Sequence, residues 1–176
     1  DVIVHGIPDD RRLEEGDILS LDLGVNLDGY YSDSARTFSV GAVDAKTEQL
    51  LRVTRECLDR AIEQAQAGNR IRDISRAVSG HAEAAHYGVV HQFCGHGVGF
   101  ELHEDPQVPN YLGAGPNPRL KPGMVIAIEP MINAGSADVV VLDDDWTVVT
   151  VDRSLSAHFE HTVAITEDGP MILTTE

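Results

Sequence analysis

The sequence predicts one α+β domain that combines two helices with a series of β-strands. Three observations predict this fold class. Residues 44–66 and residues 73–87 place apolar side chains at the three- and four-residue spacing of amphipathic helices. Residues 18–25 and residues 30–40 are β-rich runs separated by an Asn-Leu-Asp-Gly turn signal. Beyond residue 88, short apolar runs alternate with Gly and Pro, which is typical of further strands and turns.

The composition is that of a globular protein. The 176 residues fit a single domain, expected over residues 1–176, with 42% hydrophobic and 24% charged residues. Acidic residues outnumber basic ones, 29 against 13, which gives a formal net charge of -16. This charge argues against nucleic acid or an anionic membrane as the main partner. It suits cations, either metal ions or positively charged peptide termini.

Two cysteines, Cys57 and Cys94, form neither a disulfide framework nor a CxxC motif, so a reduced, cytoplasmic compartment is expected. The chain shows no apolar run long enough for a membrane span and no signal peptide. It starts with Asp rather than Met and already reads as a strand over Asp1–Val4. We therefore expect a domain that is incomplete at its N-terminus.

The first strand pair brings two aspartates together. Asp22 lies on the first β-rich run and Asp33 on the second. If the turn centres on Leu27-Asp28, the aspartates face each other directly; if it centres on Asp28-Gly29, they are diagonal neighbours on the same face. Two like charges at this spacing require a cation between them or a shared proton. The alternative is two solvated aspartates near a turn.

Both predicted helices carry boundary signals. Asp44 is suited to cap a helix that runs to about Gln66, and Gly68 is expected to end it. A second helix is expected from about Asp73 to Tyr87. The side chains expected to face the core are Leu50, Val53, Cys57, Leu58, Ala61, Ile62 and Ala65 from the first helix and Ile74, Val78, Ala82 and Ala85 from the second.

A glycine-rich stretch, Phe93–Pro106, contains two histidines in an open setting. The preceding run Val89–Phe93 is expected to form a strand, which would place His96 at its end. Glycines on both sides of His96 remove side chains from around it and let other groups approach its backbone. With His103 one short loop later, this arrangement indicates a site. The alternative is a glycine-rich turn whose histidines satisfy local hydrogen bonds.

Two glutamates lie on strand-like runs in the last third of the chain. Glu129 ends the buried-looking run Met124–Ile128. Glu160 lies within a strand expected over Ser156–Thr166, in an alternating pattern with His158. A carboxylate that ends an apolar strand is costly to bury unless it is paired or binds a metal. Shorter strands are expected over residues 139–142, 146–151 and 171–173.

Asp22, Asp33, His96, Glu129 and Glu160 form the strongest candidate constellation, because all five lie on or at the end of predicted strands. Four carboxylates and one imidazole are a hard, oxygen-rich donor set that suits Mn(II), Fe(II), Co(II) or Zn(II). Two dications would offset the repulsion between the carboxylates, and metals about 3.5–4 Å apart can share bridging carboxylates. The sequence has no His-Glu-x-x-His motif, no Gly-x-Ser-x-Gly elbow and no phosphate-binding loop with Lys-Ser/Thr.

Further motifs follow one another in order along the chain. They are His5-Gly6-Ile7-Pro8, Gly95-His96-Gly97-Val98-Gly99, Leu102-His103-Glu104-Asp105-Pro106, Lys121-Pro122-Gly123-Met124, Ile128-Glu129-Pro130-Met131-Ile132-Asn133-Ala134-Gly135, Trp146-Thr147-Val148 and Phe159-Glu160-His161-Thr162. With these motifs, essentially the whole chain resembles the type I methionine aminopeptidases of metallopeptidase family M24. The resemblance implies their pita-bread fold, a mixed antiparallel sheet with flanking helices. It also implies that the family's N-terminal segment is missing.

The resemblance implies a role for each candidate ligand. Asp22 would bind one of two divalent metal ions, His96 and Glu129 would bind the other, and Asp33 and Glu160 would bridge them. The ions would be Co, Mn, Fe or Zn. A water or hydroxide held between them would attack the scissile carbonyl, with Glu129 as the proton acceptor.

Four further residues would act on the substrate if the resemblance holds. His103 would hydrogen-bond the substrate and help to stabilise the tetrahedral intermediate. His5 would contact the peptide nitrogen or the leaving group. Leu102 and Trp146 would line the pocket for the methionine side chain.

The implied activity is removal of the initiator methionine from nascent proteins whose second residue is small. The implied partners are the N-termini of nascent polypeptides and peptides beginning with Met, without a nucleic-acid or membrane partner. A cytoplasmic monomer is expected, with association with the ribosome as an option.

Two alternatives stay open. The segment Tyr30–Phe38 is closer to the Xaa-Pro aminopeptidases and dipeptidases of the same fold, whereas Glu129–Asn133 follows the methionine-type pattern. A pita-bread domain that binds a peptide without catalysis is the second alternative. Such domains typically lose metal ligands, and all five ligand types are present in this chain.

Overall fold

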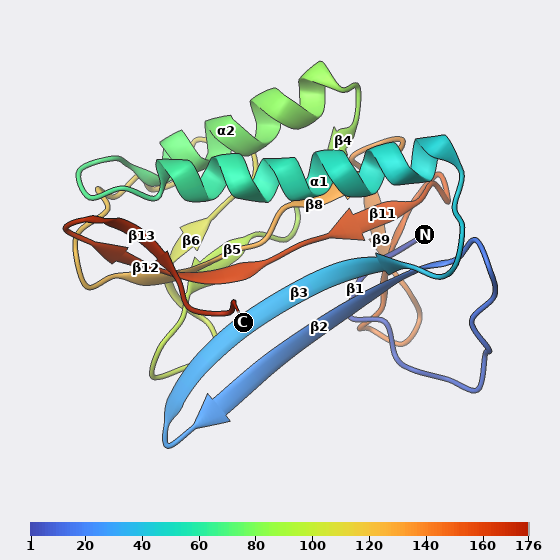
Figure 1. The fold of residues 1–176 in the computed structure, drawn as a ribbon, viewed down its shortest axis with the longest axis horizontal. Helices are drawn as coiled ribbons and strands as arrows, with labels where there is room; N and C mark the ends of the chain where they lie inside the picture. The colour runs from blue at the N-terminus through green and yellow to red at the C-terminus, as the bar shows by residue number, and fades with distance from the viewer. Residues whose placement is uncertain (176) are drawn as a thin grey trace.

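The computed structural model describes residues 1–175 and is an α+β structure, as the sequence predicts (Figure 1). Helices α1 (Ala45–Gln64) and α2 (Ile71–Ala84) pack against each other and cover one side of the strands. The strands are β1 (Val2–Val4), β2 (Ile18–Leu27), β3 (Tyr30–Ser39), β4 (Gly88–Val89), β5 (Gly95–Gly97), β6 (Glu104–Val108), β7 (Val125–Ile128), β8 (Met131–Asn133), β9 (Val139–Val141), β10 (Val148–Thr150), β11 (Ser156–His158), β12 (His161–Thr166) and β13 (Gly169–Ile172).

Within residues 1–175 the strands pair in four antiparallel sheets. A five-stranded sheet has the order β13-β12-β7-β5-β6, and two three-stranded sheets have the orders β11-β8-β4 and β1-β10-β9. Strands β2 and β3 form a separate hairpin that extends along the side away from the helices (Figure 1). The helices lie on one side of these antiparallel sheets, so the site can form on the other side.

The β2–β3 hairpin sets the relation between Asp22 and Asp33. Its turn centres on Asp28-Gly29, whose φ angles of 53° and 89° are both positive, as a type I′ turn requires. Gly24 therefore pairs with Asp33, and Asp22 pairs with Ala35. The two aspartates are diagonal neighbours on one face, which is the second of the two registers that the sequence allows.

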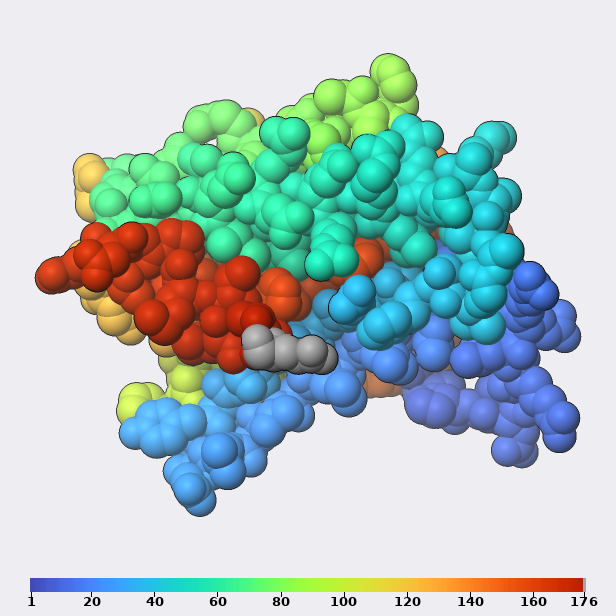
Figure 2. Space-filling model, viewed as in Figure 1, coloured from blue at the N-terminus to red at the C-terminus, as the bar shows by residue number. Residues whose placement is uncertain are grey.

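The opposite face of the same hairpin is apolar and uncovered. Leu21, Leu23, Val25 and Leu27 alternate with the aspartate side of β2, and each is between 45% and 71% exposed. In Figure 2 the hairpin stands out from the lower edge of the body. An exposed apolar stripe of this kind is typical of a surface against which another element packs.

Two strand runs pass from one sheet into another, and each does so at a glutamate. Strands β7 and β12 pair in the five-stranded sheet, whereas β8 and β11 pair in a three-stranded sheet. Glu129-Pro130 links β7 to β8, and Phe159-Glu160 links β11 to β12. The prediction of one strand over Ser156–Thr166 is therefore wrong. Its backbone changes partners at Glu160, whose N–H donates to the carbonyl of Ala35 on β3 at 2.8 Å.

The prediction of a strand over Val89–Phe93 is also wrong, because β4 covers only the start of this run and the chain turns outward at the exposed His91 and Gln92. His96 lies in the middle of β5 and not at a strand end. Strand β5 is enclosed between β6 and β7. A Cβ atom at Gly95 would run into a backbone carbonyl of β7, and one at Gly97 into a backbone carbonyl of β6. Glycine is required at both positions because the neighbouring backbones approach so closely.

Both helices begin and end near the predicted positions. The Asp44 carboxylate caps α1 by accepting a hydrogen bond from the N–H of Thr47 at 2.8 Å. The C-cap of α1 lies three residues before Gly68. Helix α2 starts two residues earlier than predicted, because Asp73 accepts a hydrogen bond from the N–H of Arg70 from within the first turn. No helix of residues 1–175 is both long and apolar enough to cross a membrane.

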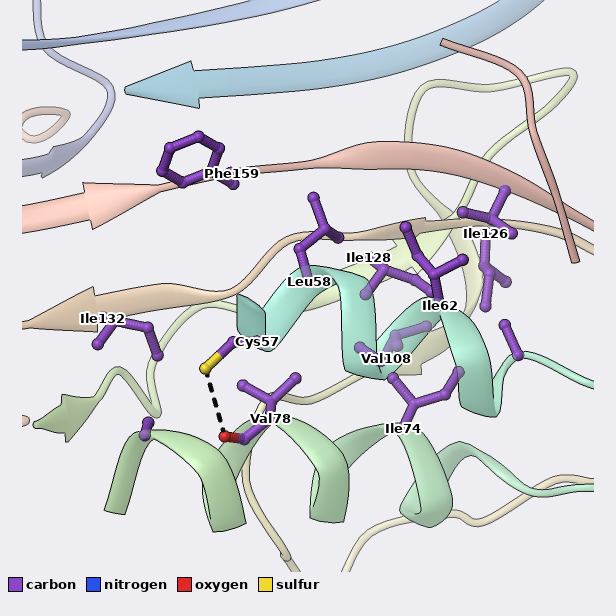
Figure 3. Packing of buried hydrophobic residues seen from close by; sticks show 14 of the residues in the cluster. Cys57, Leu58, Ile62, Ile74, Val78, Val108, Ile126, Ile128, Ile132 and Phe159 are labelled. Carbon is purple, nitrogen blue, oxygen red and sulfur yellow. Dashed lines mark hydrogen bonds between the residues drawn. The ribbon is translucent and has the colours of Figure 1, made fainter. Parts of the chain in front are cut away.

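The main hydrophobic core lies between the helices and the sheets (Figure 3). All the side chains predicted to face the core from α1 are buried, as are three of the four from α2. Cys57 belongs to this core, as predicted. Its thiol donates to the carbonyl oxygen of Val78 at 3.6 Å, and burial raises its pKa to about 12. Leu58 of α1 and Ile128 of β7 lie in the same cluster, and each such buried side chain contributes about 1.5–3 kcal/mol. The core thus supports β7 directly before Glu129.

Candidate metal centre

The five predicted ligands come together from four parts of the fold. Asp22 and Asp33 come from the hairpin, His96 from β5, and the two glutamates from the links between sheets. Their ligand atoms fall into groups of three whose members lie within 4.8 Å of one another. The groups are Asp22 with Asp33 and Glu160, His96 with Glu129 and Glu160, and Asp33 with His96 and His103. Because the groups share members, they form one continuous cluster.

The imidazole of His96 is already oriented for a ligand. Its Nδ1 atom is 2.9 Å from the carbonyl oxygen of Gly97, which can only accept, so Nδ1 carries the proton. Nε2 is left with its lone pair, 3.5 Å from Oε1 of Glu129 and 3.7 Å from Oδ2 of Asp33. Burial lowers the pKa of His96, which favours the neutral ring that binds metals.

The carboxylates of Asp22, Glu129 and Glu160 have a raised pKa, which means that their charged forms are unfavourable where no cation is bound. Burial, then the charges of Asp22 and Asp33, raises the pKa of Glu129 to about 8, and burial raises that of Glu160 well above its usual value. Asp22 lies at the open edge of the cluster, and partial burial and the charge of Asp33 raise its pKa too. Oε1 of Glu160 is buried without a hydrogen-bond partner among the described residues. These oxygen and nitrogen donors fit a divalent metal ion.

We expect the metal-free protein to lose stability as the pH rises from 5 to 8. The folded state raises the pKa of Glu129 from 4.5 to about 8. The contribution of Glu129 to the free energy of unfolding is therefore fully present below pH 4.5, and it is lost as the pH rises through the pKa of about 8 in the folded state. Thermal unfolding in a chelator should show a loss on the order of a few kcal/mol across this range. Glu129→Gln, which does not titrate, should reduce the loss, and an equal loss in both proteins would contradict the assignment.

The backbone of Asp33 is fixed by one residue of the five-stranded sheet. The hydroxyl of Thr162 accepts a hydrogen bond from the N–H of Asp33 at 2.8 Å and donates one to its carbonyl oxygen at 2.7 Å. Thr162 lies on β12, two residues beyond Glu160. The contact therefore ties the hairpin to β12, which begins directly after Glu160.

The predicted substrate residues lie around the cluster in two places. His103 is exposed, and its ring centroid is 4.3 Å from that of His96. Leu102 lies over Gly24 on the aspartate face, with a methyl carbon 3.1 Å from the place a Cβ would occupy. His5 stacks on the exposed Trp146, with centroids 4.2 Å apart.

A cavity of about 590 Å³ adjoins the cluster on the side of His96 and His103. Its other lining residues are Cys94, Gly95, Glu101, Glu104, Asp105 and Gln107. Leu102 and Trp146, which the sequence predicts as walls of one pocket, do not line this cavity in the described part of the chain. The structure therefore brings the five ligands and His103 together, whereas Leu102 and Trp146 lie outside the lining of this cavity.

Sequence reasoning missed one residue at the centre. His158 is buried at the end of β11, and its Nε2 atom is 3.7 Å from Oε2 of Glu129. His158 and Glu160 are two residues apart, and alternate residues of a strand share a face, so this spacing indicates that His158 lies on the same side as Glu160. The same pattern is equally typical of a core residue, so the alternation alone could not assign His158 to the site.

Buried carboxylates that require a cation, beside an imidazole already held neutral, are characteristic of a metal-dependent hydrolase. The chain belongs to metallopeptidase family M24, which it matches over residues 1–167. It is therefore an enzyme of the hydrolase class, and membership of this family implies binding of divalent metal. The pita-bread fold is confirmed by its structural relatives.

Three relatives illustrate the likeness. Methionine aminopeptidase 1 of Bacillus subtilis is 53% identical over 172 residues, which cover 98% of this chain and 69% of the relative. The crystal structure of a methionine aminopeptidase from Thermotoga maritima superposes with a TM-score of 0.96 at 48% identity, covering 99% of this chain and 71% of that chain. A prolidase from Pyrococcus furiosus is similar with a TM-score of 0.78 at 31% identity, covering 98% of this chain and 45% of that chain.

Proposed function

We propose that this protein is a methionine aminopeptidase that removes the initiator methionine from new polypeptides when the second residue is small. The observation that carries the proposal is the convergence of the five donors in overlapping groups of three. The identity of 53% to a methionine aminopeptidase supports the choice of substrate. The acidic site, in a chain of net charge -16, would also attract the positively charged N-terminus of a peptide substrate.

The proposed centre holds two divalent metal ions, which are Co, Mn, Fe or Zn. Asp22 would hold one ion, His96 and Glu129 would hold the other, and Asp33 and Glu160 would be shared between them. The shared membership of Glu160 in the groups of Asp22 and of His96 supports its bridging role. When bound, such ions lower the pKa of a water molecule and polarise the scissile carbonyl.

The side chains around the proposed centre accept the proton of the attacking water or donate hydrogen bonds to the substrate. Glu129 would accept the proton of the attacking water, because its carboxylate belongs to the donor cluster where that water would be held. His103 donates a hydrogen bond to the oxygen of the tetrahedral intermediate. His5 contacts the peptide nitrogen or the leaving amine, and the stack with Trp146 supports the orientation of its ring. Leu102 and Trp146 contribute apolar surface for the methionine side chain.

We propose that residues 1–176 are one catalytic domain and that a further N-terminal segment of the natural protein completes the pocket and the sheet. Two observations support this. The matched relatives are longer, since the chain covers 69% and 71% of two of them. The apolar side chains Leu21, Leu23, Val25 and Leu27 on the outer face of β2 are uncovered. A packed segment would remove this surface from water.

The proposed setting is the cytoplasm, where the enzyme acts as a monomer on the N-termini of nascent polypeptides, including those still on the ribosome, and on peptides that begin with Met. Both cysteines are free, which suits a reducing compartment. The acidic net charge supports neither a nucleic-acid nor a membrane partner.

An Xaa-Pro peptidase is the second candidate function. The likeness to a prolidase, with a TM-score of 0.78, and the sequence of Tyr30–Phe38 favour it. The higher identity to methionine aminopeptidases, 53% against 31%, favours the first candidate.

Release of free methionine from the peptide Met-Ala-Ser separates the two candidates. We expect release by the natural full-length polypeptide in the presence of Mn(II) or Co(II), and none after chelation. An Xaa-Pro peptide, tested in parallel, should stay intact. Cleavage of the Xaa-Pro peptide without release of methionine would transfer the assignment to the second candidate. Cleavage of neither peptide, with metal bound, would point to a domain that binds peptides without catalysis.

A further inference from the structure

His158 lies beside the metal centre and has no part in the chemistry described so far. Its side chain is only 2% exposed, and neither ring nitrogen has a hydrogen-bond partner among the described residues. Nε2 of His158 is 3.7 Å from Oε2 of Glu129, whereas Nε2 of His96 is 3.5 Å from Oε1 of the same carboxylate. The carboxylate of Glu129 thus lies between two imidazoles, one on each of its oxygens.

The position of His158 is fixed by its backbone. Its N–H donates to the hydroxyl of Thr37 at 2.8 Å, and the same hydroxyl donates to its carbonyl oxygen at 2.9 Å. On the other side, β11 pairs with β8, which places His158 opposite Met131. The main chain is thus held from both sides, and the close packing around the buried ring limits its rotation away from Glu129.

We propose that His158 is a positioning residue: its Nε2–H, 3.7 Å from Oε2 of Glu129 in the metal-free chain, closes to a hydrogen bond with that oxygen when the centre is occupied and so holds Oε1 toward His96 and the metal centre. The inference rests on the proposed function, because Glu129 serves there as ligand and proton acceptor. Carboxylates that bind metals are commonly held by such a neighbouring N–H, and its loss typically costs 10–100-fold in metal affinity or activity.

The chemistry of the ring supports this assignment. The ring is almost completely removed from water, which favours its neutral form. A neutral imidazole carries one proton, and the nearby acceptor Oε2 favours the tautomer with that proton on Nε2. A residue that only filled space would leave both buried nitrogens unsatisfied, which an apolar side chain of the same size would avoid.

The test compares His158→Gln with His158→Met in the natural full-length polypeptide. The two side chains have nearly the same shape, but only glutamine carries an N–H donor. With Met-Ala-Ser as substrate and Mn(II) present, we expect the methionine variant to lose about 10–100-fold in kcat with KM nearly unchanged. Its affinity for Mn(II), measured by calorimetry, should fall about tenfold. The glutamine variant should recover most of both losses.

His81→Met is the matched control. His81 lies on α2 in the helical layer, where its Nε2 is 2.7 Å from the carboxylate of Glu56, so this change should leave kcat and Mn(II) affinity as in the wild type. Equal kcat and equal Mn(II) affinity in the two His158 variants would overturn the proposal, as would a change in KM alone. A wild-type protein that binds Mn(II) but releases no methionine would instead overturn the proposed function. The calorimetric comparison would then still decide the role of His158.

Discussion

Replacement of Asp33 by asparagine is expected to abolish turnover and to leave the fold intact. Asp33 belongs to two of the three donor groups, and the amide removes the negative charge proposed to bridge two metal ions. The hydroxyl of Thr162 bonds to the N–H and the carbonyl oxygen of Asp33, and the amide oxygen of asparagine can still accept the hydrogen bond that the N–H of Ser34 donates to Oδ1 at 3.1 Å. We expect kcat for Met-Ala-Ser to fall at least about 10³-fold at saturating Mn(II). The melting temperature of the chelated protein should not fall.

Asp28→Asn is the matched control for this experiment. It makes the same chemical change at the turn of the same hairpin, where the residue is exposed and has a φ of 53° that asparagine tolerates well. Its activity should equal that of the wild type. An Asp33→Asn variant with near-wild-type activity would rule out a dinuclear centre bridged by Asp33.

Replacement of His103 by alanine is expected to reduce kcat by about 10²–10³-fold with little change in KM. The ring lies beside that of His96, with centroids 4.3 Å apart, where it can donate to an oxygen that becomes negative only in the tetrahedral intermediate. An interaction made only in the transition state affects kcat and not substrate binding. Steady-state kinetics with Met-Ala-Ser and Mn(II) would measure both constants.

His91→Ala provides the comparison for His103. His91 is also exposed and precedes the same glycine-rich stretch, but its ring stacks on Tyr111, with centroids 4.1 Å apart. Its loss should leave both constants unchanged. If His103→Ala raised KM and left kcat intact, His103 would serve in substrate binding and not in stabilising the intermediate.

The parts of the fold that the sequence predicts well are those whose signals are local. Helix α1 is amphipathic along its length and has Asp44 at its cap, so its face and its start agree with the structure. The register of the hairpin depends on one turn, and Asp28-Gly29 is the pair that adopts two positive φ angles most readily. Asp22 and Asp33 could therefore be placed on one face before any coordinates were known.

The parts that the sequence predicts poorly depend on partners that are distant in the chain. In a continuous β-rich run such as Ser156–Thr166, no residue pattern indicates the point at which the backbone stops pairing with β8 and pairs with β3. In the run Val89–Phe93, only the beginning is buried and finds a strand to pair with, whereas His91 and Gln92 are exposed. For His158, the decisive fact is that both ring nitrogens lack partners, and no spacing in a sequence records that.

The links at Glu129 and Glu160 have a consequence for how the protein opens. Each glutamate lies where the chain crosses between the five-stranded sheet and the sheet of β8 and β11. An ion bound by both carboxylates is therefore attached to both strand runs at the crossing, and the two sheets cannot separate there while it stays bound. Binding of such an ion would therefore be coupled to the local stability of β7–β8 and β11–β12. Amide hydrogen exchange in these strands would then report the binding of the ion.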